Sequence, residues 1–222
     1  MRSLRAPLLA LRLSLALALG VAALSAPRPA RASISFAVAY DDMVTDSDAV
    51  AVVTALEHQS VWEENRIVTY THLRVEEGIA GNLATGAETW VRTLGGSVGN
   101  IGQQVGGEPV FVQGKVSLIF ARATKPGTVS VVARAQGQFP VLVDPATKRR
   151  SVMKNANCGL LVPRVEAVAS TAPAPAGVAP RAVPTPVPTP TAARVVAVDA
   201  LHGRSLEDVA RDISAQWKRL HK

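Results

Sequence analysis

Twelve consecutive residues carry the strongest structural signal in the chain: Arg66-Ile67-Val68-Thr69-Tyr70-Thr71-His72-Leu73-Arg74-Val75-Glu76-Glu77. Every second side chain points to the same side of an extended backbone. One face of this stretch is therefore formed by Ile67, Thr69, Thr71, Leu73 and Val75. The other, partly wet face is formed by Val68, Tyr70, His72, Arg74 and Glu76. This alternation predicts a β-strand that covers a core on one side.

Further β-like runs lie on both sides of this strand. Residues 49–56 form an apolar run rich in β-branched residues, and residues 62–65 suit a hairpin connection between the two. Later strands are expected at 89–94, 115–121, 128–135, 138–143 and 151–153. Turn sequences separate several of these runs, and no helical pattern of ten or more residues interrupts them. The pattern predicts a mainly β fold, either a small antiparallel barrel or a sandwich.

Two helices are expected at the ends of this β-rich region. Residues 41–47 carry acids in their first turn and predict a short N-terminal helix. Residues 195–198 suggest one more short strand, after which Ser205 resembles the cap of a second helix. Apolar residues recur at helical spacing on one face of this C-terminal helix, namely Leu206, Val209, Ile213, Trp217 and Leu220. That face must be buried, either against the β-rich region or against a partner.

Composition divides the chain into four regions. Residues 1–32 have the form of an export signal: a basic start, an apolar run at 13–26 and the small-x-small sequence Ala30-Arg31-Ala32. Residues 33–163 form the expected β-rich globular domain, and the Pro/Ala/Thr-rich residues 164–193 suit an extended linker. The short strand and the amphipathic helix occupy 194–222. We therefore expect a periplasmic or secreted protein with no transmembrane segment after cleavage.

Charge argues against a nucleic-acid partner. The chain has a formal net charge of +7, but residues 1–32 hold five arginines and no acid. Residues 33–163 carry eleven basic and twelve acidic side chains, a net charge of −1. A nucleic-acid interface needs positive charge on the folded domain, so we expect none here.

The glycine-rich segment that begins at Leu94 is the best candidate for ligand contact. It lacks the Gly-Lys-Ser/Thr ending of a phosphate-binding loop and is expected to be a long loop between strands. Binding residues gather on loops that a rigid scaffold holds in place. The predicted contacts are Gly95, Gly96, Ser97, Asn100 and Gln103.

A basic run near a predicted hairpin tip is a second candidate surface. It comprises Lys148, Arg149, Arg150 and Lys154, and it would suit an anionic envelope surface. Cys158 is the only cysteine, so no internal disulfide can form. A buried thiol and an intermolecular disulfide are both open.

Residues for metal or catalytic chemistry show no recognisable pattern. His58 and His72 fall on opposite faces of the expected hairpin, and the acidic residues at 41–48 do not match a calcium loop. No Ser lies in a Gly-x-Ser-x-Gly elbow. We therefore expect no metal, no cofactor and no catalytic set.

One sequence pattern resembles an uncharacterised group of exported bacterial proteins with a β-rich domain. It combines residues 67–77 with Val91-Arg92-Thr93-Leu94-Gly95-Gly96 and Ile101-Gly102-Gln103, within residues 45–142. The resemblance implies an exported β domain and carries no catalytic residues.

These observations lead to one functional expectation and two alternatives. The expectation is an exported, non-catalytic β domain that acts as a binding or envelope accessory module, with an unknown protein or envelope partner. One alternative is a secreted hydrolase whose catalytic set is assembled from residues far apart in the chain. The other is a binder of anionic envelope surfaces that uses residues 148–154.

Overall fold

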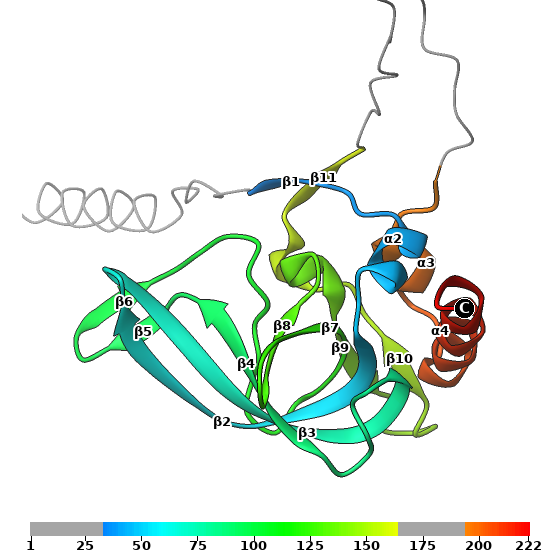
Figure 1. Ribbon diagram of the computed structural model, residues 1–222, viewed down its shortest axis with the longest axis horizontal. Coiled ribbons are helices and arrows are strands. Elements are labelled where there is room, and N and C mark those ends of the chain that lie inside the picture. Colours follow the sequence, from blue (N-terminus) through cyan, green and yellow to red (C-terminus); the bar gives the residue numbers. More distant parts are fainter. Residues whose placement is uncertain (1–32, 164–193) are drawn as a thin grey trace, which may run out of the picture. The chain divides into compact units, whose positions relative to one another are not determined.

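The computed structural model describes residues 33–163 and 194–222, in which β-strands predominate over helices (Figure 1). The predicted export signal at 1–32 and the predicted linker at 164–193 lie outside the described residues. Within the described ranges, no helix is both long enough and apolar enough to cross a membrane.

A long hairpin of β2 (Ala49–Glu63) and β3 (Arg66–Gly81) dominates the sheet. Glu63 pairs with Arg66, so the turn consists of Glu64 and Asn65, both in the left-handed region with φ of 45° and 62°. Two successive left-handed residues match the right-handed twist of the strands that they join. The predicted alternation is confirmed at Leu73 and Val75, which are buried while Arg74 and Glu76 are exposed and His72 is half-buried. It is wrong at Val68, which was predicted on the partly wet face and is buried.

Five strands form a partly closed barrel around part of the core. They are β2, β3, β4 (Glu88–Leu94), β7 (Val116–Lys125) and β8 (Thr128–Val131). If these strands are numbered 1 to 5 along the chain, their pairings run 1-2-3-5-4 and return to 1. The contact between β4 and β8 is parallel and consists of two pairs, Trp90 with Thr128 and Val91 with Val129. The barrel is therefore open along the rest of this seam.

Shorter strands extend the barrel. β9 (Gln138–Val143) pairs with β7, and β10 (Arg150–Val152) pairs with β9. β5 (Gly96–Val98) and β6 (Ile101–Gln103) form a small hairpin at the end of the molecule away from the helices (Figure 1). β1 (Ile34–Phe36) pairs with β11 (Leu160–Val162).

The predicted strand at 128–135 is wrong beyond Val131. Ala133 and Arg134 have φ of 54° and 57°, which is incompatible with an extended strand, and the 3₁₀ helix η1 (Arg134–Gly137) follows. A second such turn, η2, spans Ala156–Cys158.

The predicted strand at 195–198 is also wrong. Val196 makes only an isolated bridge to Ala39, and helix α3 (Ala197–Leu201) begins directly after it. Ala197 and Val198 are both buried in the same core. An extended strand would turn these two neighbours to opposite faces, whereas a helix can place both against the core.

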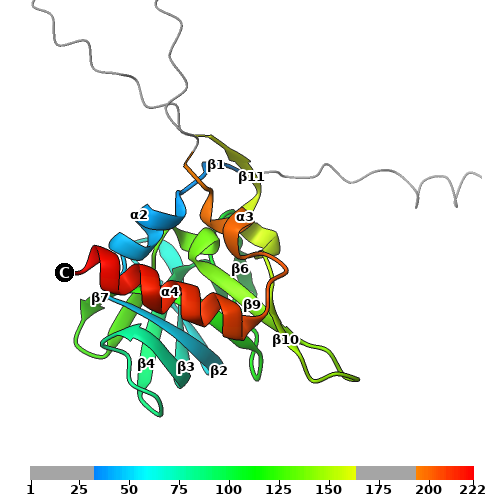
Figure 2. The same ribbon diagram turned by 90° about the vertical axis from the view of Figure 1, so that its right-hand side faces the viewer.

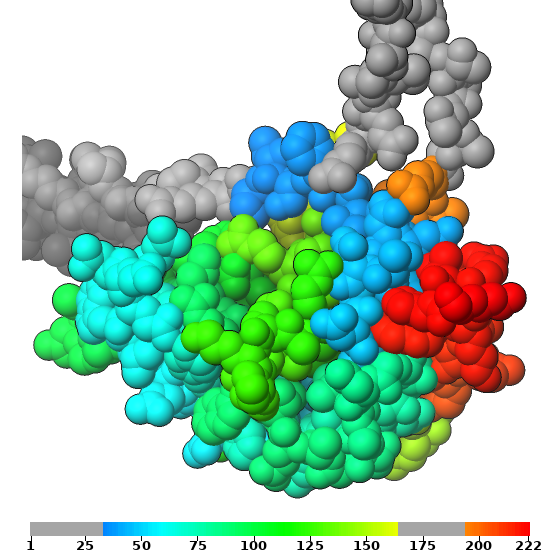
Figure 3. All heavy atoms as spheres, viewed as in Figure 1, coloured from blue at the N-terminus to red at the C-terminus, as the bar shows by residue number. Residues whose placement is uncertain are grey.

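The C-terminal helix α4 (Leu206–Leu220) packs on the chain's own β region beside α2 (Tyr40–Thr45) (Figures 2 and 3). Its predicted apolar face lies in the core that β7, β9 and α3 share: Leu206, Val209 and Ile213 are fully buried, and Trp217 and Leu220 pack against them. Gln216 Nε2 donates to Asp41 Oδ1 at 2.6 Å. The sequence was compatible with burial of this face either against the β-rich region or against a partner. In the structure it is buried against the chain's own β region.

Candidate functional site

The candidate site lies where the seam between β4 and β8 opens. Beyond the pair of Val91 and Val129 the two strands separate, and a groove with a volume of about 320 Å³ occupies the space. Both strands and the neighbouring loops line it, with Arg66, Arg92, Leu94, Glu108, Pro109, Ser130, Val131 and Arg134. This volume is at the lower end of the range for small-molecule sites, roughly 300–1,000 Å³.

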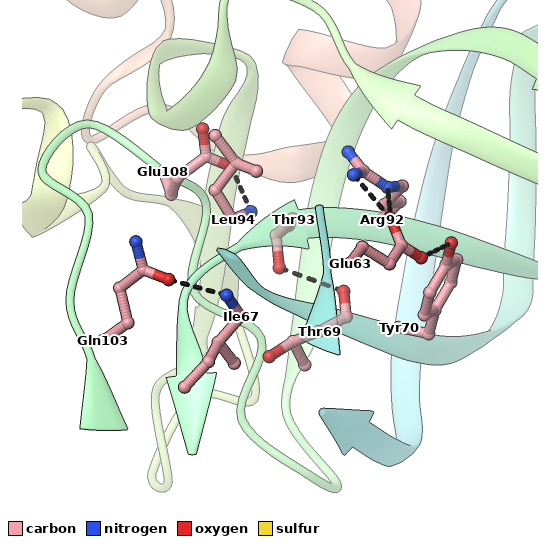
Figure 4. A network of polar contacts seen from close by, with 9 residues as sticks. All are labelled: Glu63, Ile67, Thr69, Tyr70, Arg92, Thr93, Leu94, Gln103 and Glu108. Atoms are coloured by element: carbon pink, nitrogen blue, oxygen red, sulfur yellow. Dashed lines mark hydrogen bonds and ion pairs between the residues drawn. The ribbon is translucent and has the colours of Figure 1, made fainter. Parts of the chain in front are cut away.

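The loop after β4 forms one wall of the groove and is tied to the long hairpin. Gln103 Oε1 accepts a hydrogen bond from the backbone N–H of Ile67 at 2.7 Å (Figure 4). The Gly95 N–H donates to the Ile67 carbonyl at 2.7 Å. Thr69 Oγ1 donates to the Gly95 carbonyl at 2.6 Å. These bonds hold the wall against the hairpin.

Glu108 replaces the backbone partner that the open seam removes. Its Oε2 accepts from the Leu94 N–H at 3.0 Å, where β8 no longer pairs with β4 (Figure 4). Its Oε1 accepts from Arg134 Nε at 2.5 Å, and the side chain is only 11% exposed. A buried backbone donor needs a partner, so this carboxylate allows the seam to stay open without an orphaned amide.

Arg134 is presented by a strained turn. It and Ala133 both have left-handed φ values, which non-glycine residues seldom adopt and which cost about 1–3 kcal/mol each. The N–H of Ala135 donates to the carbonyl of Gly107 at 2.9 Å and holds the turn against the 95–114 loop. The turn directs the Arg134 side chain to the groove.

A polar triad lies beside the groove on the outer face of the barrel. The guanidinium of Arg92 contacts Glu63 Oε2 through Nη2 at 2.7 Å, and the hydroxyl of Tyr70 donates to Glu63 Oε1 at 2.6 Å (Figure 4). The Tyr70 hydrogen bond, followed by the Arg92 hydrogen bond, lowers the pKa of Glu63. The same bond to Glu63 raises the pKa of Tyr70. Both shifts move away from neutrality, whereas a general acid or base works best near the operating pH.

The five residues predicted as ligand contacts do not line the groove. Gly95 and Gln103 anchor the loop instead, and Gly96 allows close packing, since a Cβ there would lie 2.2 Å from Thr69 Oγ1. Ser97 and Asn100 are exposed on the β5–β6 hairpin. The predicted contacts and the groove share the 95–114 loop, but the residues of this loop that line the groove are Glu108 and Pro109.

Sequence reasoning missed the three arginines that line the groove. Arg66 follows a hairpin turn, Arg92 lies on β4, and Arg134 begins η1. No spacing rule links three residues that are so far apart in the chain. The available signal was that Arg92 interrupts an otherwise apolar or hydroxyl-bearing strand, residues 89–94.

The structure separates the members of the predicted basic surface. Lys148, Arg149 and Lys154 are exposed. Arg150 instead forms ion pairs with Glu207 at 2.9 Å and with Glu77 at 3.7 Å. It therefore joins β10 to α4 and β3, and its charge is partly neutralised within the chain.

Neither Cys158 nor the histidine pair of the hairpin lies in an arrangement typical of a reactive or metal-binding site in the described part of the chain. The thiol is buried, lies 3.3 Å from the Ala135 carbonyl, and borders a second cavity of about 190 Å³. Burial raises the pKa of the Cys158 thiol, which disfavours the reactive thiolate. His58 pairs with Thr71 across the hairpin, and His72 pairs with Glu57. Since neighbours along a strand point to opposite faces, His58 and His72 lie on opposite faces of the sheet. Among the described residues, no three His, Cys, Asp or Glu side chains form a group that could hold a metal ion.

Comparison of the chain with known proteins found no matching family, no matching curated protein and no matching solved structure. A function for this chain therefore has to be inferred from the geometry of the groove itself. The resemblance to exported β-domain proteins stays an expectation.

Proposed function

We propose that the chain is an exported, non-catalytic binding module that holds its ligand in the groove at the open barrel seam. The observation that carries this proposal is the role of Glu108. Its carboxylate satisfies the Leu94 N–H that would otherwise be orphaned, and so keeps a concave site open between two barrel strands. A site that is formed before the ligand arrives loses less entropy on binding.

The residues of the groove favour binding over hydrolysis. Its lining includes one hydroxyl, that of Ser130, and one carboxylate, that of Glu108. Both oxygens of Glu108 are already engaged, one by Arg134 and the other by a backbone N–H. A nucleophilic serine needs an adjacent base with a free lone pair. No hydrogen bond joins Ser130 to Glu108 in the part of the chain that the structure describes, and Glu108 is held instead by Arg134 and the Leu94 N–H. The alternative of a secreted hydrolase is therefore the weaker one.

Export supports an extracytoplasmic ligand. The basic start, apolar run and small-x-small site at residues 1–32 favour delivery to the periplasm or the medium. The buried apolar face of α4 leaves the groove as the better candidate surface for recognition. The binder of anionic envelope surfaces through residues 148–154 is the weaker alternative, because Arg150 is already paired with Glu207 and Glu77.

The test is to fill the groove and measure capture. Mature protein, residues 33–222, is immobilised and exposed to a solubilised envelope fraction of the producing cell, and the retained species are identified by mass spectrometry. Ser130→Trp should abolish retention, because the indole occupies the groove. Ala146→Trp, at the exposed hairpin tip, is the matched control and should retain what the wild type retains.

Circular dichroism must first show that both variants are folded. Equal retention by Ser130→Trp and the wild type would remove the groove as the binding site. Loss of retention in Ala146→Trp alone would favour the basic hairpin instead. Turnover of a substrate that disappears in Ser130→Ala would contradict a non-catalytic role.

A further inference from the structure

Resting on the function proposed above, we propose that the groove recognises an oxyanion, a carboxylate or a phosphate group on a small organic ligand, through Arg66, Arg92 and Arg134. The three arginines line one concavity and come from three different parts of the fold. A guanidinium presents its donors in a planar fork that matches carboxylate and phosphate oxygens.

The positive charge is local to the groove. Three arginines and one carboxylate line it. The surrounding residues 33–163 carry a net charge of −1. General basicity of the domain therefore does not account for the arginines. Arg92 and Arg134 each pair with one carboxylate, Glu63 and Glu108, so the three arginines leave a net positive charge at this concavity that favours an anion.

Each arginine keeps donors that the protein does not use. Arg66 makes no ion pair within the parts of the chain that the structure describes. Arg134 engages Glu108 through Nε, and no other described residue takes its two terminal nitrogens. Arg92 gives Nε and Nη2 to Glu63, and its guanidinium also interacts with the Tyr70 hydroxyl, so Arg92 has fewer unused donors than the other two arginines. An entering oxyanion could thus accept several hydrogen bonds without breaking an existing one.

The backbone at Arg134 provides an independent argument. Two successive non-glycine residues, Ala133 and Arg134, hold left-handed conformations there. Glycine would adopt these φ values without strain. Strain of this kind gathers at ligand clamps and functional sites. We attribute its retention here to the position that it gives the Arg134 side chain.

The rest of the lining limits the size of the ligand. Leu94, Pro109 and Val131 add apolar surface beside the arginines. A volume of about 320 Å³ suits an anionic head group with a short apolar body. Arginines would fix the orientation of the head group while the apolar residues contact its body.

The proposal is tested by titrating ¹⁵N-labelled mature protein, residues 33–222, with phenyl phosphate, benzoate and uncharged benzamide at constant ionic strength. Saturable shifts of the arginine Nε–Hε signals are expected with at least one anion and not with benzamide. The anion that binds more tightly identifies the head group as phosphate or carboxylate. Absence of saturable shifts with both anions overturns the proposal.

Matched variants locate the binding charge. Arg66→Gln removes an unpaired, exposed guanidinium and should weaken the tighter anion about three- to tenfold, as expected for one charged hydrogen bond. Arg149→Gln makes the same charge change at the exposed hairpin tip and should leave affinity unchanged. Equal weakening by both variants would show a nonspecific charge effect and overturn the proposal.

This result is separable from the proposed binding function. If envelope material is lost with Ser130→Trp but retained at full level by Arg66→Gln, and neither anion binds, the groove is a binding site for a different chemistry. If Ser130→Trp retains everything, the binding function itself falls.

Discussion

Tyr40, the first residue of α2, buries a polar group at a cost. Among the described residues its hydroxyl finds no hydrogen-bond partner. Burial, reinforced by the negative charges of Asp212 and Asp41, raises the pKa of Tyr40 to about 12. A buried hydroxyl without a partner costs about 1–3 kcal/mol of stability.

Tyr40→Phe should therefore leave the free energy of unfolding unchanged or raise it by up to about 1 kcal/mol. Urea denaturation at pH 7 measures this difference. Between pH 10 and 12 the unfolded state of the wild type loses the Tyr40 proton while the folded state retains it. The wild type therefore loses stability as the pH rises from 10 through 12, and no such loss occurs below pH 10. The variant should lack that loss. A variant clearly less stable than the wild type at pH 7 would show that the hydroxyl has a partner.

Gly96 shows how one residue permits the loop to dock. Its φ is +131°, and a Cβ would lie 2.2 Å from Thr69 Oγ1 and 2.4 Å from Ser60 Oγ. Gly99, in the turn of the same small hairpin, has φ of +59° with open space around it. Gly99 therefore tests a positive φ alone, whereas Gly96 combines a different positive φ with close packing.

We expect Gly99→Ala to cost about 1 kcal/mol, the usual penalty for a left-handed alanine. Gly96→Ala should cost at least about twice as much, because the clash adds to the strained backbone. Urea denaturation of both variants measures the difference. Equal costs would mean that the 95–114 loop moves away from the hairpin easily and does not form a fixed wall.

At the scale of elements, α4 is stabilised both by its own end residues and by its packing on the β region. Ser205 caps the helix by accepting from the Asp208 N–H, and its acidic first turn and basic last turn suit the helix dipole. Its apolar face enters the core, and Ser214 Oγ donates to the Ile79 carbonyl on β3 at 3.2 Å. The packing of α4 therefore contributes to the stability of the whole β unit.

Ile213→Ala should destabilise the protein by about 2–5 kcal/mol, since it leaves a cavity at a fully buried position. Lys218→Ala, on the exposed side of the same helix, should stay within about 0.5 kcal/mol of the wild type. Chemical denaturation measures both. Similar small effects would indicate that α4 detaches before the sheet unfolds.

At the scale of the whole molecule, two hydrophobic clusters are joined through β2. Val50 and Val52 belong to the cluster that includes the helices, whereas Ala51 and Val53 belong to the cluster inside the barrel. Alternate side chains of one strand therefore serve both clusters. This shared strand predicts that helices and barrel unfold together.

The protein of residues 33–222 should show one unfolding transition, with coincident curves from far-UV circular dichroism and tryptophan fluorescence. The fluorescence reports on Trp62 in β2, Trp90 in β4 and Trp217 in α4. Deleting residues 194–222 exposes the apolar surface that α3 and α4 cover and should lower the melting temperature or abolish cooperative unfolding. An unchanged melting temperature in the truncated protein would contradict a shared core.

The sequence by itself determined the local structure. Alternation over residues 66–77 and helical spacing over 206–220 were sufficient for a long strand and an amphipathic helix, because each pattern depends on neighbours within a few residues. Where local preference conflicted with burial, as at 195–198, the prediction was wrong, since β-branched residues took the conformation that the core allowed.

Only the tertiary structure decided the order of strand pairings, the surface against which α4 packs, and the position of the groove. The partial contact of β4 with β8 opens the seam, and only then do Arg66, Arg92 and Arg134 meet around Glu108. Register and closure arise from pairings between residues far apart in the chain. A local pattern contains no information on which distant strand end will face it, and the groove exists only where two such ends separate.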